Sequence, residues 1–134
     1  MSDHSRGQAF LAVVFLIGGI VVFSGVLLAF LASTFIDSGY GYQASIVAEA
    51  AADSGAQDAL LQLDRDPNFS STGYALAVGS TTATVAVTQA SPSKGYVTIL
   101  SSATVSSRTR KIQVVVAEDD STDLLSVISS QEIQ

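Results

Sequence analysis

Residues 9–36 read AFLAVVFLIGGIVVFSGVLLAFLASTFI, an apolar stretch that decides the fold of this chain. No charged side chain occurs from Gly7 to Ile36. As an α-helix, this stretch rises about 42 Å, more than the roughly 30 Å hydrocarbon core of a bilayer. The apolar region of an ordinary secretory signal peptide has only about 7–15 residues. The sequence therefore predicts a helix long enough to span a membrane.

The charges that flank this stretch predict its orientation. Arg6 is the only firm positive charge before it, and after it no Lys or Arg occurs until Arg65. Positive flanking charge favours the cytoplasmic side of a membrane. We therefore expect a cytoplasmic N-terminus and a C-terminal domain outside. Within the stretch, Gly18-Gly19 and Ser24-Gly25 are either a packing face or flexible point, or glycines that a membrane helix simply tolerates.

Helical character continues beyond the apolar stretch. Residues 44–63 are rich in Ala, Leu, Gln and Glu, which are good helix formers. Pro67 disfavours helical conformation at Asp66 and predicts the end of the helix there. The expected apolar stripe on this half, narrow and mostly alanine, consists of Val47, Ala51, Ala56, Ala59, Leu60 and Leu63.

The remainder of the chain is rich in Ser, Thr, Val and Gly, and alternating apolar residues predict strands. The expected strands are residues 74–78, 82–88, 96–105, 109–117 and 124–133. Short turns between successive strands favour an antiparallel meander, with a loop or bulge at residues 106–108. The predicted fold class is α+β: a long N-terminal helix, with a membrane-spanning half and an amphipathic half, packed on a small antiparallel sheet of about 4–5 strands.

Composition argues against several functions. The chain has six Lys+Arg, twelve Asp+Glu and a net charge of −6, with no basic stripe for nucleic acid beyond Arg108, Arg110 and Lys111. Cysteine is absent, and His4 is the only histidine. We find no catalytic constellation, phosphate loop or dinucleotide fingerprint. We therefore expect no enzyme activity, no cofactor and no nucleic-acid partner.

Three weaker patterns remain. Asp119, Asp120 and Asp123 could supply oxygen ligands to Ca²⁺, although their spacing does not match an EF-hand and a solvated turn is the simpler interpretation. Glu49 and Asp53 lie one helical turn apart and could form a pair of carboxylates, although a solvated helix face is the simpler interpretation. Residues 68–70 match the N-x-[ST] glycosylation pattern.

The chain start, Ser5-Arg6-Gly7 followed directly by an apolar helix, resembles the class III leader of type IV pilins and pseudopilins. Residues 48–51, AEAA, also resemble a stretch of minor pilins. The resemblance covers the whole chain in architecture, and these two sites in residues. It implies a leader at residues 1–7, a long helix at 8–66 (filament core 8–36, amphipathic half 37–66) and a β-rich domain at 69–134.

The resemblance also implies a function: a structural subunit of a pilus or pseudopilus filament at the cell surface, stored in the inner or cell membrane before assembly. Prepilin peptidase would cut between Gly7 and Gln8, and the new amine would be methylated. The implied partners are other pilin subunits, the peptidase, the pilus or secretion assembly machinery and membrane lipid. The implied assembly residues are Phe10, Leu11, Ala12, Phe15, Leu16 and Phe23.

Two positions depart from the family pattern. The first mature residue, usually Phe or Met, is Gln8, and the usual Glu of the first mature turn is replaced by Ala12. These departures favour a minor or atypical subunit. The alternative function is a permanent single-pass anchor that presents a small binding domain outside the cell. An accessory subunit of an envelope enzyme or secretion complex is a third interpretation.

Overall fold

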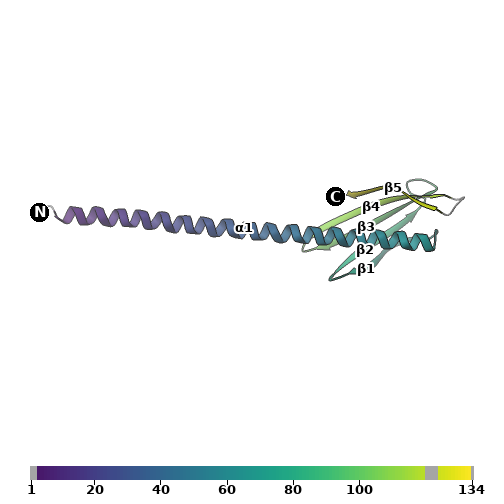
Figure 1. Cartoon of the computed structure of the whole chain (residues 1–134), viewed down its shortest axis with the longest axis horizontal. Helices are drawn as coiled ribbons and strands as arrows, with labels where there is room; N and C mark the ends of the chain where they lie inside the picture. The colour runs from purple at the N-terminus through teal and green to yellow at the C-terminus, as the bar shows by residue number, and fades with distance from the viewer. Residues whose placement is uncertain (1–2, 120–123, 134) are drawn as a thin grey trace. The chain divides into compact units, whose positions relative to one another are not determined.

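The computed structural model describes the backbone of residues 3–119 and 124–133, and the side chains of residues 7–118 and 125–133. It contains one helix followed by five strands (Figure 1). The elements are α1 (Asp3–Arg65), β1 (Ser71–Val78), β2 (Thr81–Gln89), β3 (Tyr96–Val105), β4 (Arg108–Asp119) and β5 (Leu124–Ile133). The chain divides into two compact units between Tyr40 and Gly41. The second unit contains residues 41–65 of α1 and all five strands.

Helix α1 ends where the sequence predicts. The amide of Asp66 still donates to the Gln62 carbonyl at 2.9 Å, as in a continuing helix. Pro67 then prevents further helical turns, since its ring restricts the preceding residue and it has no amide proton. The carboxylate of Asp66 accepts the amide of Asn68 at 3.1 Å, which closes a local turn after the helix.

The five strands form one antiparallel sheet in the order β1-β2-β3-β4-β5. The predicted fold class, a long helix on a small antiparallel sheet, is thus confirmed. Gly79-Ser80 joins β1 to β2, and Ser106-Ser107 joins β3 to β4. Both serines of the second turn have positive φ, at 46° and 64°, as a type I′ turn requires. Arg108, which we expected in this loop, is instead the first residue of β4, paired with Val105.

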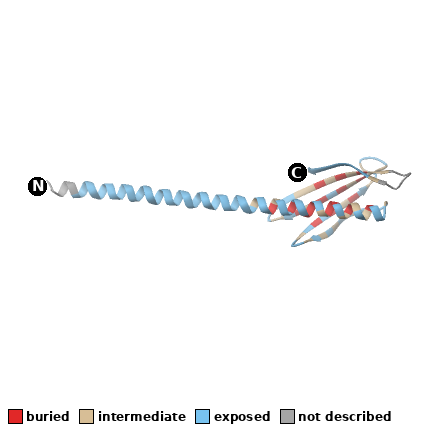
Figure 2. Ribbon diagram, viewed as in Figure 1, coloured by how far each residue is buried: buried red, intermediate tan, exposed pale blue. Residues whose placement is uncertain are grey.

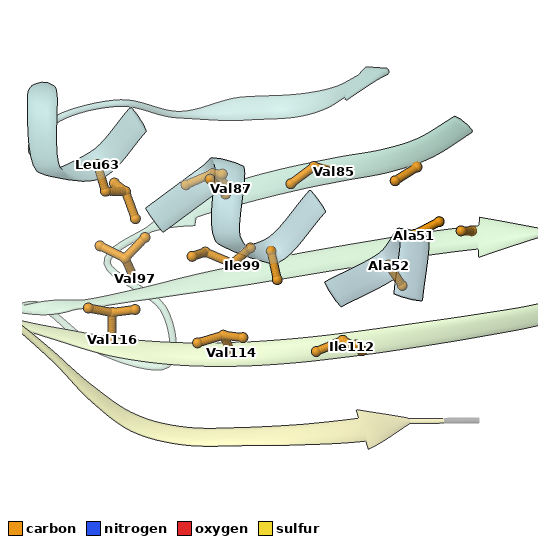
Figure 3. Close-up of a cluster of buried hydrophobic side chains, with 14 residues drawn as sticks. Ala51, Ala52, Leu63, Val85, Val87, Val97, Ile99, Ile112, Val114 and Val116 are labelled. Carbon is orange, nitrogen blue, oxygen red and sulfur yellow. The ribbon is translucent and has the colours of Figure 1, made fainter. Parts of the chain in front are cut away.

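The core lies between residues 44–63 of α1 and the central strands. Strands β2, β3 and β4 bury alternate residues, as a sheet with one covered face must. Figure 3 shows Val85, Ile99 and Val114 from these strands beside the helix. The buried hydrophobic residues of the helix are Ala44, Ala48, Ala51, Ala52, Ala56, Ala59 and Leu63. The small alanine side chains allow the helix backbone to approach the sheet closely.

The predicted stripe on this half of α1 was partly wrong. Val47, which we placed in it, is 39% exposed, and Leu60 is only half-buried. Ala48 and Ala52 are fully buried instead. Alternative stripes on an alanine-rich helix differ little in hydrophobicity, so the sequence alone did not fix the rotation of the helix on the sheet. Close approach selects the face whose side chains are smallest.

The closest approach occurs at Gly55, which is buried opposite β2 and β3. A Cβ built on Gly55 would lie 2.8 Å from Val85 Cγ2 and 3.1 Å from Ala83 Cβ, and closer still to Ser101 Oγ. Ser101 is the one buried polar residue among the described side chains, and its hydroxyl has no hydrogen-bond partner among them. A small residue on each side of this contact lets helix and sheet meet.

Polar contacts join the end of α1 to the sheet. The Tyr74 hydroxyl of β1 donates to Asp58 Oδ2 of α1 at 2.7 Å. Gln89 of β2 donates from Nε2 to the carbonyls of Pro67 at 2.9 Å and Phe69 at 2.8 Å. These bonds fix the connection between α1 and β1, which the hydrophobic pattern did not predict.

The Tyr74 contact predicts a loss of stability in alkali. Burial, together with the hydrogen bond and negative charge of Asp58, raises the pKa of the Tyr74 hydroxyl well above its usual value. The unfolded chain therefore releases this proton near pH 10, while the folded unit still holds it. Stability is fully present below about pH 10 and falls as the pH rises above it.

The measurement is the urea midpoint of the full chain between pH 8 and 11.5. We expect Tyr74→Phe to be less stable than the parent at pH 8, because Asp58 loses a donor, but to have a shallower decline above pH 10. Tyr96→Phe is the matched control and should keep the parent slope. Equal slopes for the parent and Tyr74→Phe would contradict this assignment.

Candidate functional site

The candidate functional surface is the first half of α1. Every residue from 7 to 40 is exposed within the chain, and Figure 2 shows this part of α1 in pale blue. This part of α1 is long and apolar enough to cross a membrane, by length and composition. Exposed large apolar patches mark surfaces that bind lipid or protein. Such a surface is typical of a segment that lipid or another protein chain covers.

The predicted assembly residues all lie on this surface. Phe10 and Phe15 are among the most exposed, at 71% and 76%. Leu11, Ala12, Leu16 and Phe23 are exposed too. At 3.6 residues per turn, five of the six lie within about 140° of the helix circumference, and Phe10 lies outside this arc. Apolar residues surround the helix on all sides, as is typical of a helix covered on all sides.

Two of the few polar side chains of this segment bond to their own helix. The hydroxyl of Ser24 donates to the Ile20 carbonyl at 2.8 Å, and that of Thr34 to the Phe30 carbonyl at 3.0 Å. Each bond reaches back four residues along the helix, so these protons need no partner from water. The segment can therefore enter an apolar environment without leaving these donors unpaired.

Gly18 and Gly19 form a shallow depression on this helix. Its walls are Val14, Phe15 and Val22. A Cβ on either glycine would meet nothing within 4 Å, so these glycines serve no packing inside the chain. The glycines do not break α1, which is continuous through them. This excludes a helix break, and leaves both the packing face and plain tolerance as interpretations.

The predicted cleavage junction lies inside a helix. Helix α1 begins at Asp3, so Gly7 and Gln8 belong to its first turns, and both are exposed. A Cβ on Gly7 would meet nothing within 4 Å. Gly7 thus has no packing role within the described chain, and any requirement for glycine there would come from outside it.

The predicted calcium ligands lie outside what the structure describes: Asp120 and Asp123 entirely, and Asp119 in its side chain. Among the described residues, no group of three or more His, Cys, Asp or Glu could hold a metal ion. Glu49 and Asp53 are exposed beside a shallow groove with Ile46, Ala50 and Ile112. Gln57 donates to Asp53 Oδ2 at 2.8 Å, as on an ordinary solvated helix face.

The basic residues of β4 make contacts inside the second unit. Arg110 donates to Ser45 Oγ from Nε at 2.8 Å and pairs with Glu132 of β5 at 2.5 Å. The guanidinium of Arg108 lies beside Gly41, where a built Cβ would be 3.3 Å from Nη2. Arg110 therefore links α1, β4 and β5. Both arginines stand out in the sequence, but these contacts could not be predicted from it, since their partners are distant in the chain.

No family model, curated protein or solved structure matches the chain. The class that the fold defines is a small α+β protein with a membrane-length apolar helix. The resemblance to pilins remains a prediction from the leader and the order of the elements.

Proposed function

We propose that this protein is a structural subunit of a type IV pilus or related pseudopilus filament, and that it assembles through the apolar half of α1. The observation that carries the proposal is the complete exposure of residues 7–40, in a chain whose helix–sheet unit has its own core. In this proposal the membrane covers the helix before assembly, and neighbouring subunits cover it afterwards. The helix–sheet units form the outer layer.

The free energy of each helix contact indicates how many neighbouring subunits a filament helix needs. Once the helix has left the bilayer, burial of about 400 Å² of its apolar surface from water stabilises a contact by about 10 kcal/mol, at 25 cal/mol per Å². Association costs about 4–15 kcal/mol in lost freedom, so one such contact barely holds two helices together. A helix that is apolar all round has room for several contacts of this size. Burial on every side favours a bundle over a dimer.

The alternative is a permanent single-pass anchor for an extracytoplasmic binding domain. The same exposed segment supports it, because lipid would cover all sides of the helix at once. The anchor requires no cleavage and no contact between copies. The two functions therefore differ at the N-terminus of the cellular protein and in its state of assembly.

The test is a substitution at the leader junction. We expect Gly7→Leu to leave the chain uncleaved, in the membrane and absent from sheared filaments, because a side chain at this position would obstruct a peptidase that accepts glycine. The parent chain should begin at Gln8, with or without a methylated amine. Mass spectrometry of the N-terminus and of the filament fraction measures both effects.

Gly39→Leu is the matched control, since Gly39 lies in the same helix and a Cβ there also meets nothing within 4 Å. It should be processed like the parent. Parent chains that begin at Met1 or Ser2 and never polymerise would support the anchor. Processed chains in filaments of Gly7→Leu would refute the proposed role of this junction.

A further inference from the structure

Asn68 is the only asparagine in the chain, and it begins the tripeptide Asn68-Phe69-Ser70. This tripeptide matches the acceptor pattern for N-linked sugar, whose middle residue is any but proline. It lies in the connection between α1, which ends at Arg65, and β1, which begins at Ser71. Acceptor sites of this kind lie on surface loops, where a bulky sugar can be accommodated.

The tripeptide is anchored at its centre and exposed at its ends. The Phe69 ring is half-buried and packs edge-to-face against Tyr74, with ring centroids 6.0 Å apart. Asn68 and Ser70, on either side of it, are exposed. The acceptor side chain and the hydroxyl that a transferase must recognise are therefore both accessible from solvent.

The backbone around Asn68 is held by bonds that do not use its side chain. Gln89 binds the carbonyls before and after Asn68, those of Pro67 and Phe69. Asp66 accepts the Asn68 amide, and its carbonyl accepts the Phe69 amide at 2.9 Å. No hydrogen bond within the described chain involves the Asn68 carboxamide. A substituent on that carboxamide therefore breaks no contact that holds the connection.

We propose that Asn68 carries an N-linked glycan. In the transfer, Asn68 Nδ2 forms a bond to the anomeric carbon of a sugar that is carried on a lipid pyrophosphate. The bond from that carbon to the phosphate oxygen breaks, the lipid pyrophosphate leaves, and the amide proton passes to a base of the transferase. No oxidant or reductant is required. The inference rests on the proposed function in one respect, the placement of the helix–sheet unit outside the membrane.

The experiment is mass spectrometry of the protein from the cells that produce it. Trypsin should release residues 66–94, because Arg65 and Lys94 are consecutive basic residues. In the parent we expect this peptide to be heavier than its sequence by at least one sugar residue, with the added mass on Asn68. The shift should disappear in Asn68→Gln and in Ser70→Ala, which keeps the asparagine.

Ser70→Thr is the matched control, since it preserves the acceptor pattern and should keep the added mass. An unmodified peptide in the parent overturns the inference, and so does a shift that persists in Ser70→Ala. The N-terminal mass from the same sample separates the two proposals. Chains that begin at Gln8 but carry bare Asn68 would overturn only the glycan, whereas glycosylated chains that begin at Met1 or Ser2 would overturn only the filament subunit.

Discussion

Replacing Gly55 with alanine is expected to lower the free energy of unfolding of the helix–sheet unit by about 2 kcal/mol. Overpacking of a close contact costs about 1–3 kcal/mol, and here two neighbours must move at once. The new Cβ would lie 2.8 Å from Val85 Cγ2 and would also collide with Ser101 Oγ. This cost exceeds the roughly 1 kcal/mol that alanine gains over glycine inside a helix. Urea unfolding of the full chain in detergent, followed by tyrosine circular dichroism, measures it.

The matched control is Gly39→Ala, the same change in the same helix, at a site where a Cβ meets nothing within 4 Å. It should not destabilise the helix–sheet unit. Adding Ser101→Ala to Gly55→Ala should recover part of the loss, because it removes one collision and also an unpaired buried hydroxyl. Equal stability of Gly55→Ala and Gly39→Ala would contradict the close approach described here.

Placing a charge at the middle of the apolar segment should have the largest effect on function. We expect Phe23→Asp to lower the equilibrium constant for membrane integration by about 100-fold, since a charged side chain at the centre of a membrane helix costs about 3 kcal/mol. Phe23 is 65% exposed, so the substitution creates no cavity in the helix–sheet unit. Alkaline extraction of membranes measures integration, and shearing measures assembly.

Phe23→Leu separates the effect of charge from the loss of the ring, and should integrate like the parent. Ser38→Asp places the same charge in the same helix, beyond the uncharged stretch, and should also integrate. If Phe23→Asp remained fully integrated and assembled, the apolar surface would not be what holds the chain in a membrane or filament.

Much of the fold could be predicted because each pattern was local. The uncharged run predicted the apolar half of α1, and apolar residues aligned on one face predicted β2, β3 and β4 to within a few residues. The final strand, expected at residues 124–133, has these bounds. Strand β1 was predicted from Tyr74 but begins at Ser71, because cross-strand pairing with Val87 extends it. Polar residues such as Ser71 and Thr72 give no hydrophobic signal, so this extension was not visible in the sequence.

What could not be predicted depends on contacts between distant residues. Gly55 looks like any glycine in a helix until Ser101 and Val85 are seen opposite it. Gln89 gives no sign in the sequence that it binds carbonyls twenty residues earlier. The candidate site is different: its exposure follows from an apolar length that exceeds what the small domain can cover. The composition of residues 9–36 was sufficient to predict that surface.

The inward hydrogen bond of Ser24 affects how freely the helix can move against its surroundings. From residue 9 to residue 32, Ser24 has the only polar side chain, and its proton is already given to Ile20. No side chain in residues 9–32 therefore has a free hydrogen-bond donor that could hold a neighbouring helix at one position along the helix axis. A neighbouring helix can therefore slide by one residue, about 1.5 Å, without breaking a directional bond. Only the fit of ridges and hollows, the Gly18-Gly19 depression among them, resists such slippage.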